Sequence, residues 1–201
     1  MVRIIYRRRI ERAGFTIVEL LIVIVVIAIL AAISVVAYNG IQARTLNTKT
    51  EQAVAEYQKI LIAYATEKGS YPGDGTSACL GPIDAYPNGC FYGNVQAQFA
   101  TDLQSYLGSS LLPIPNTECM KMYTESCRRS ASFVVKSWPL DGVTHRYWIT
   151  YLLKDNAKCS LPNLAGGGWE NPSITPYPNG WTEQNSGTSL CRIILPDPAS
   201  L

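Results

Sequence analysis

The sequence has little of what catalysis usually requires. It contains a single histidine, His145, so metal sites built on paired histidines and most acid–base schemes lack their residues. It has no C-x-x-C pair and no G-x-S-x-G elbow, and Gly166-Gly167-Gly168 lacks the lysine and the strand-and-helix context of a phosphate loop. We therefore expect no enzymatic activity, no cofactor and no metal, and we expect a structural role for His145.

Charge is also sparse, and it is unevenly distributed. The formal net charge is +2, but five of the 17 basic residues and one of the 15 acidic residues lie within residues 1–14, which leaves 12 basic and 14 acidic residues beyond them. Only one basic pair, Arg128-Arg129, follows this N-terminal region. Because affinity for a phosphate backbone needs many such contacts, we do not expect nucleic acid as a partner.

One long apolar run stands out against this background. No polar side chain occurs from Leu20 to Ile33, and the apolar character continues past Ser34 to Tyr38. With the residues from Phe15 onward, the segment is long enough to span a bilayer as a helix. Five arginines precede it, whereas only Arg44 follows closely, so the N-terminus is expected in the cytoplasm and the rest of the chain outside it.

Two other interpretations of this segment stay open. A secretory signal peptide has an apolar core of 7–15 residues, shorter than this run, although Val35-Val36-Ala37 offers a small-residue cleavage site. An uncleaved signal anchor is the third option.

The entrance to the run carries a recognisable pattern, Ala13-Gly14-Phe15-Thr16-Ile17-Val18-Glu19-Leu20-Leu21. An acid inside an apolar segment costs about 2.5–3.5 kcal/mol on insertion scales, so Glu19 needs compensation or a hydrated position near the membrane interface. The pattern resembles that of type IV prepilins. The resemblance implies cleavage after Gly14, N-methylation of Phe15, and contact between Glu19 and the Phe15 amine of a neighbouring subunit. It covers only the leader and the apolar segment.

The resemblance implies a structural subunit of a surface filament that serves adhesion, motility or DNA uptake. The implied partners are identical or related pilin subunits, the prepilin peptidase with the assembly machinery, and the lipid bilayer before assembly. A pseudopilin of a type II secretion system shares the same N-terminal pattern. Two alternatives of other classes are a monomeric membrane-anchored binding protein and a secreted hydrolase with a cleft around His145.

The apolar run is expected to continue into an amphipathic helix. Residues Leu46, Thr50, Ala53, Val54, Tyr57, Ile60, Leu61 and Tyr64 recur at spacings of three and four. We therefore expect one helix from Phe15 to about Lys68, which ends at Gly69 and Pro72. Asn39-Gly40 is its weakest point, because glycine costs about 1 kcal/mol relative to alanine inside a helix. Val36 stands where many pilins carry proline, which leaves open whether the helix bends or melts at all; if it does, Gly40 is the better candidate.

Six cysteines lie beyond the membrane segment, and an even count in an exported region implies disulfides. Six cysteines allow 15 pairings. The short separations favour nearest neighbours, namely Cys79 with Cys90, Cys119 with Cys127, and Cys159 with Cys191.

The remainder of the chain predicts a small α+β head. A short helix is expected from Asn94 to Gly108, an antiparallel hairpin from residues 132–138 and 146–153, and a third strand over residues 191–195. The expected order is a leader (1–14), a transmembrane and assembly helix (15–38), its amphipathic continuation (39–68) and a disulfide-stapled head (69–201). The long helix packs on a small antiparallel sheet.

The segment between Cys159 and Cys191 is rich in glycine and proline, so we expect an irregular loop there. Its aromatic residues Trp169, Tyr177 and Trp181 are candidate surface contacts, and packing back onto the sheet is the alternative. Tyr86-Pro87-Asn88-Gly89 recurs as Tyr177-Pro178-Asn179-Gly180, which indicates repeated turn chemistry rather than a binding repeat.

Overall fold

The computed structural model describes residues 15–73, 76–81, 89–90, 96–107, 113, 115, 120–122, 124–128, 131–140, 143–162, 174–177, 180–183 and 187–201. The chain divides into two compact units, Met1–Ile41 and Gln42–Leu201. A single long helix, α1 (Ile17–Lys68), contributes to both units.

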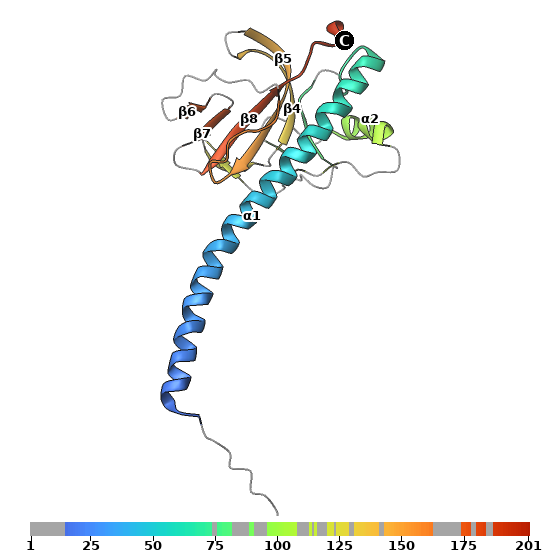
Figure 1. Ribbon diagram of the computed structural model, residues 1–201. Coiled ribbons are helices and arrows are strands. Elements are labelled where there is room, and N and C mark those ends of the chain that lie inside the picture. Colours follow the sequence, from blue (N-terminus) through green and yellow to red (C-terminus); the bar gives the residue numbers. More distant parts are fainter. Residues whose placement is uncertain are drawn as a thin grey trace, which may run out of the picture. The chain divides into compact units, whose positions relative to one another are not determined.

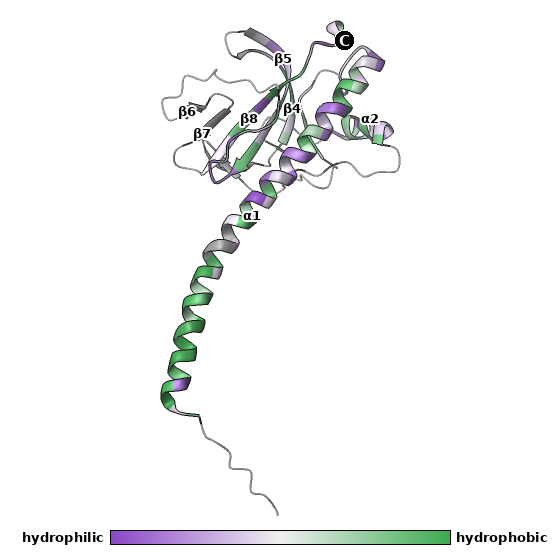
Figure 2. Ribbon diagram, viewed as in Figure 1, coloured by the Kyte–Doolittle hydropathy of each residue, from purple (hydrophilic) through white to green (hydrophobic). Residues whose placement is uncertain are grey.

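In the first unit, the described side chains of α1 are exposed and almost all apolar (Figure 2). By length and composition this part of the helix is able to cross a membrane. Its serine is satisfied locally, because Ser34 Oγ donates a 2.7 Å hydrogen bond to the Leu30 carbonyl oxygen. The helix is unbroken through Asn39 and Gly40, and a Cβ placed on Gly40 would meet no atom within 4 Å. A bend or local melting at this point stays a prediction.

In the second unit, one face of α1 packs on a six-stranded antiparallel sheet (Figure 1). The strand order is β1-β4-β5-β8-β7-β6. The strands are β1 (Ala78–Cys79), β4 (Ala131–Leu140), β5 (Val143–Lys154), β6 (Ile174–Tyr177), β7 (Gly180–Glu183) and β8 (Thr188–Ile194). Two further strands, β2 (Met120–Met122) and β3 (Thr124–Arg128), form a separate hairpin, and β2 contacts β8.

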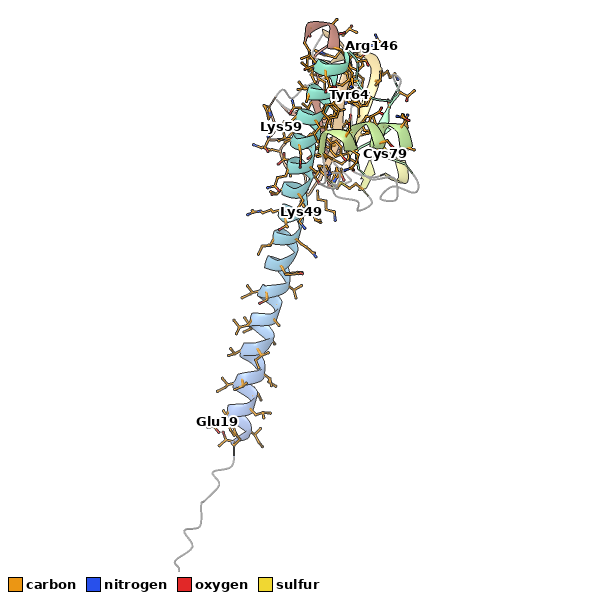
Figure 3. All side chains as sticks on the ribbon, turned by 90° about the vertical axis from the view of Figure 1, so that its right-hand side faces the viewer. Glu19, Lys49, Lys59, Tyr64, Cys79 and Arg146 are labelled. Carbon is orange, nitrogen blue, oxygen red and sulfur yellow. A yellow bond between two sulfur atoms is a disulfide. The ribbon has the colours of Figure 1, made fainter. Side chains whose placement is uncertain are left out.

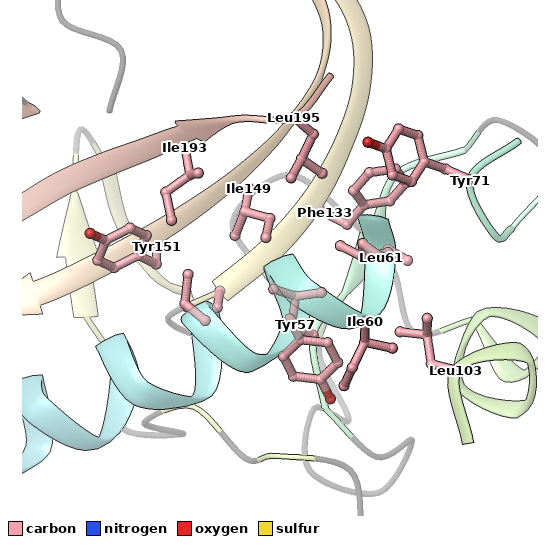
Figure 4. Packing of buried hydrophobic residues seen from close by; sticks show 14 of the residues in the cluster. Tyr57, Ile60, Leu61, Tyr71, Leu103, Phe133, Ile149, Tyr151, Ile193 and Leu195 are labelled. Atoms are coloured by element: carbon pink, nitrogen blue, oxygen red, sulfur yellow. The ribbon is translucent and has the colours of Figure 1, made fainter. Parts of the chain in front are cut away.

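The core lies between α1 and the inner face of the sheet. Figure 4 shows Ile149 and Ile193 on the sheet and Leu61 on α1 within this cluster, and all three side chains are fully buried. The second helix, α2 (Ala97–Leu107), closes one end of the core with Phe99 and Leu103. The remaining described residues of the core are Val54, Tyr57, Ile60, Ala65, Tyr71, Ala78, Leu80, Ala131, Phe133, Tyr151, Leu153, Cys191 and Leu195.

Helix α1 ends through a left-handed glycine. Gly69 has φ = +71°, and its N–H donates a 2.8 Å hydrogen bond to the Ala65 carbonyl oxygen. A residue without a Cβ adopts this conformation at little cost, so the predicted end of the helix and the observed end at Lys68 coincide. The chain then turns to Tyr71, whose hydroxyl donates a 2.9 Å hydrogen bond to the Pro196 carbonyl oxygen near the C-terminal helix η2 (Pro198–Ser200).

The outer face of the sheet is also buried, which simple strand alternation did not predict. Trp148, Thr150 and Leu152 point to this face of β5, and each is at most 4% exposed. The Trp148 ring N–H donates a 3.1 Å hydrogen bond to Thr150 Oγ1. Other parts of the chain therefore cover this face. Met120 of β2 is also buried, and β2 contacts β8.

The sheet is larger than the three expected strands. The β4–β5 hairpin extends beyond the expected strands, up to the pair Leu140 and Val143. Strands β6 and β7 lie inside the segment between Cys159 and Cys191, where we expected an irregular loop without interior strands. That expectation was wrong, because β7 pairs with β6 on one side and with β8 on the other.

Two disulfides, Cys79–Cys90 and Cys159–Cys191, lie among the described residues. They correspond to two of the three expected neighbouring pairs. The third, Cys119 with Cys127, falls outside the described residues at Cys119, and for Cys127 the structure describes only the backbone.

Four residues fasten α1 to the end of β5, and we call this group the helix clasp: Asn47, Glu51, Lys154 and Ser160. The Asn47 amide nitrogen donates to the Lys154 carbonyl oxygen at 3.0 Å, and its oxygen accepts from the Lys154 N–H at 2.8 Å. One turn later, Glu51 Oε1 accepts from the N–H and hydroxyl of Ser160 at 3.0 and 2.8 Å. The clasp fixes the level at which the sheet meets α1.

We expect Asn47→Ala to destabilise the second unit by about 2–3 kcal/mol, because two hydrogen bonds are lost at a part-buried site. Asn47→Asp should be nearly as harmful, since it keeps the acceptor but places a second oxygen against the Lys154 carbonyl. Urea unfolding of the full chain in detergent measures both effects. Thr48→Ala, at the exposed neighbouring position, is the control. If Asn47→Asp unfolds at the same urea concentration as the wild type, the hydrogen bond donated by Asn47 to the Lys154 carbonyl oxygen does not contribute to stability.

Candidate functional site

The start of α1 is a capping box built by Thr16 and Glu19. Thr16 precedes the first helical residue, and its Oγ1 accepts a 3.2 Å hydrogen bond from the Glu19 N–H. In return, Glu19 Oε2 accepts from the Thr16 N–H at 2.8 Å and from the Thr16 hydroxyl at 2.7 Å. The carboxylate therefore satisfies backbone and side-chain donors at the helix end.

This arrangement gives Glu19 a defined position at the edge of an apolar surface. An acid near a helix N-terminus is also stabilised by the helix dipole. Glu19 Oε1 makes no hydrogen bond to any residue that the structure describes, so one oxygen stays available for a further donor. Figure 3 shows Glu19 at the beginning of α1, beside apolar side chains that extend outward on all sides.

Thr16 is the residue that our sequence analysis missed. The signal was present, because Thr16-Ile17-Val18-Glu19 is a T-x-x-E capping box in front of an apolar run. From the sequence, Glu19 was expected to have an intersubunit partner or a hydrated position near the membrane interface. The structure shows that the same carboxylate also has a partner within its own chain.

The other predicted site residues are described to different extents. Phe15 is 82% exposed, immediately before the capping box. Gly14, Trp169 and the side chain of Asn39 lie outside the described residues. For Tyr177 and Trp181 the structure gives the backbone pairing, Tyr177 with Gly180 and Trp181 with Leu190. Their proposed role as surface contacts stays a prediction.

The described part of the chain offers few residues for a metal site or for acid–base catalysis. No group of three or more His, Cys, Asp or Glu side chains gathers there in a way that would hold a metal ion. His145 lies in β5, opposite Trp138 of β4, and is partly exposed.

The comparisons with known proteins agree with the geometry at the N-terminus. Residues 11–35 match a family described as the prokaryotic N-terminal methylation motif. The chain is 35% identical over 82 residues to the fimbrial protein EcpC of Eikenella corrodens. That alignment covers 41% of this chain and 52% of the relative, so the chain spans about half the length of the curated protein that it matches. No solved structure matches.

The matched segment includes the junction at Gly14 and Phe15, the capping box and most of the exposed apolar part of α1. The α+β head with its antiparallel sheet and disulfides has the architecture expected of pilins. The first part of the chain is therefore similar to the N-terminal segment of type IV pilins, and the head has a fold that fits theirs.

Proposed function

We propose that the chain is a structural subunit of a type IV pilus filament, cut after Gly14, methylated at Phe15 and polymerised through the first part of α1. The observation that supports this most directly is an apolar helix surface exposed on all sides, with one acid at its start. Such a surface needs lipid or other apolar helices around it. A membrane supplies the first environment, and a bundle of identical helices supplies the second.

The charge of Glu19 favours the filament over the membrane as the environment of the helix. In lipid, the carboxylate accepts hydrogen bonds from the backbone N–H and hydroxyl of Thr16 in its own chain. In a filament, the cationic amine of a neighbour's Phe15 reaches the same carboxylate and neutralises it, and a paired charge is less costly in an apolar surrounding than an unpaired one. The capping box holds Glu19 in position until that amine arrives.

The test is the N-terminal peptide mass of the chain, recovered separately from membranes and from filaments sheared off the cell surface. We expect a chain that begins at Phe15 and carries one added methyl group in both fractions. Recovery from membranes alone, with the same processed N-terminus, would favour a pseudopilin. An intact Met1, or a start near Tyr38, would contradict polymerisation through α1 and favour the anchored or secreted alternatives.

A further inference from the structure

The first hydrogen bonds of α1 show where the helix begins. The Leu20 N–H donates a 3.3 Å hydrogen bond to the Thr16 carbonyl oxygen, so the hydrogen-bond ladder of the helix starts at that carbonyl. Phe15 lies before this point, outside the helix, and is 82% exposed. Only Phe15 and Thr16 therefore separate the Gly14–Phe15 amide, the bond of the proposed cleavage, from the first helical residue, Ile17.

The Thr16 hydroxyl competes with the backbone for one donor. If the helix extended further toward the N-terminus, the Glu19 N–H would donate to the Phe15 carbonyl oxygen, four residues back. In the structure the Glu19 N–H donates instead to Thr16 Oγ1, at 3.2 Å. The next donor along, the Val18 N–H, is the one that a longer helix would direct at the Gly14 carbonyl oxygen. By taking the Glu19 N–H, the hydroxyl ends the helix before it reaches that carbonyl.

The sequence before the junction gives this stop a purpose. Most residues just ahead of Gly14 are strong helix formers, namely Arg9, Glu11, Arg12 and Ala13. Gly14 itself opposes a helix, because glycine loses the most conformational freedom when it is ordered. The cap formed by Thr16 acts in the same sense as Gly14, immediately on the other side of the amide that is to be cut.

Cleavage needs a free carbonyl at Gly14. Water adds across the amide: its oxygen bonds to the Gly14 carbonyl carbon, the C–N bond breaks, and the Phe15 nitrogen takes up a proton and becomes an amine. The enzyme has to polarise the carbonyl oxygen with its own donors while this happens. A carbonyl inside a helix already accepts a backbone N–H, and its segment is wound rather than extended, whereas extended segments bind partners through main-chain hydrogen bonds.

We propose that Thr16 is a positioning residue for this cleavage: its hydroxyl ends α1 at Ile17 and so keeps the Gly14–Phe15 amide available to the peptidase. The inference rests on the proposed processing after Gly14. Thr16 acts through the start of the helix and not through contact with the enzyme. Glu19→Ala keeps the hydrogen bond from the residue 19 N–H to Thr16 Oγ1, so that variant is still cut.

Two substitutions at Thr16 separate its hydrogen bond from its shape. Thr16→Val keeps the shape and removes the acceptor, and Thr16→Asn changes the shape but caps a helix at least as well as threonine. The assay is cleavage of the full precursor chain in detergent by the prepilin peptidase. We expect KM to rise about twofold to fivefold for Thr16→Val with kcat unchanged, because only the uncoiled fraction of the substrate binds. Thr16→Asn is expected to match the wild type.

Hydrogen exchange at the Phe15 amide gives a readout that does not depend on the enzyme. In a longer helix this N–H would donate to the Glu11 carbonyl oxygen, so its exchange should be slower in Thr16→Val than in the wild type. An unchanged KM and unchanged exchange in Thr16→Val overturn the positioning role. Equal loss in Thr16→Asn and Thr16→Val also overturns it, since the peptidase then reads the threonine side chain itself. A wild-type chain that is not cut after Gly14 would instead overturn the proposed function.

Discussion

Glu19→Ala is expected to reduce sheared filaments at least about tenfold while leaving the processed chain in the membrane. The substitution acts twice in the same direction. It removes the carboxylate that the Phe15 amine of a neighbour would neutralise, and it relieves the membrane-inserted monomer of about 2.5–3.5 kcal/mol of insertion cost. Both effects favour the monomer in lipid over the filament. The measurement is the amount of chain in sheared and membrane fractions.

Glu19→Gln is the matched control for this prediction. Glutamine at this position still accepts from Thr16 and completes the capping box, but it carries no charge. If charge neutralisation drives assembly, the glutamine variant fails as the alanine variant does, with Phe15 methylated in both. Wild-type filament yield from Glu19→Gln would leave the capping box, rather than the charge, as the function of this residue.

Removal of the Cys159–Cys191 disulfide, by alanine at both positions, is expected to destabilise the second unit by about 3–4 kcal/mol, because the bond closes a long loop in the unfolded chain. The separation of 32 residues compares with 11 for Cys79–Cys90, so the shorter loop should contribute about 1 kcal/mol less. Cys191 is also fully buried against the core, which adds to the loss at that site.

Thermal unfolding of the full chain in detergent measures this loss. About 3–4 kcal/mol corresponds to a decrease in Tm of about 6–16 °C for a domain of this size. The double alanine variant at Cys79 and Cys90 is the comparison. If the two variants unfold at the same temperature, loop length does not determine how much each disulfide stabilises the head.

Local signals made much of this fold predictable. The apolar run, the stripe on α1 and the left-handed glycine at its end are each recognised from residues that are close together in the sequence. The helix over Ile17–Lys68 could therefore be predicted closely. The sequence between the β4 and β5 strands contains Asp-Gly, the dipeptide that two-residue hairpins prefer. These elements need no distant partner to be recognised.

The rest depends on contacts between distant parts of the chain. Strands β6 and β7 are short, contain Pro176 and Gly180, and lie in a segment rich in proline and glycine, which argues against a sheet. The pairing of β7 with β6 and with β8 decides the outcome. Asn47 interrupts the apolar stripe for a partner 107 residues away. At the candidate site, Glu19 was predictable from its position in the apolar run. Its hydrogen bonds with Thr16 follow from the capping-box pattern at the start of the helix, which is a separate signal from membrane insertion.

The edge strand of the sheet affects whether neighbouring heads pair their sheets when they are packed closely together. Among the described strands, β6 is the outermost, and Tyr177 pairs with Gly180 at the end of the β6–β7 hairpin. By the alternation of an antiparallel ladder, the backbone nitrogen of Pro176 faces away from β7. Proline has no N–H, so the free edge lacks a donor where another strand would need one. A filament would hold many copies of this head at very high local concentration. With Pro176 at their edges, such heads can stand side by side along a fibre without their sheets fusing into continuous cross-β structure.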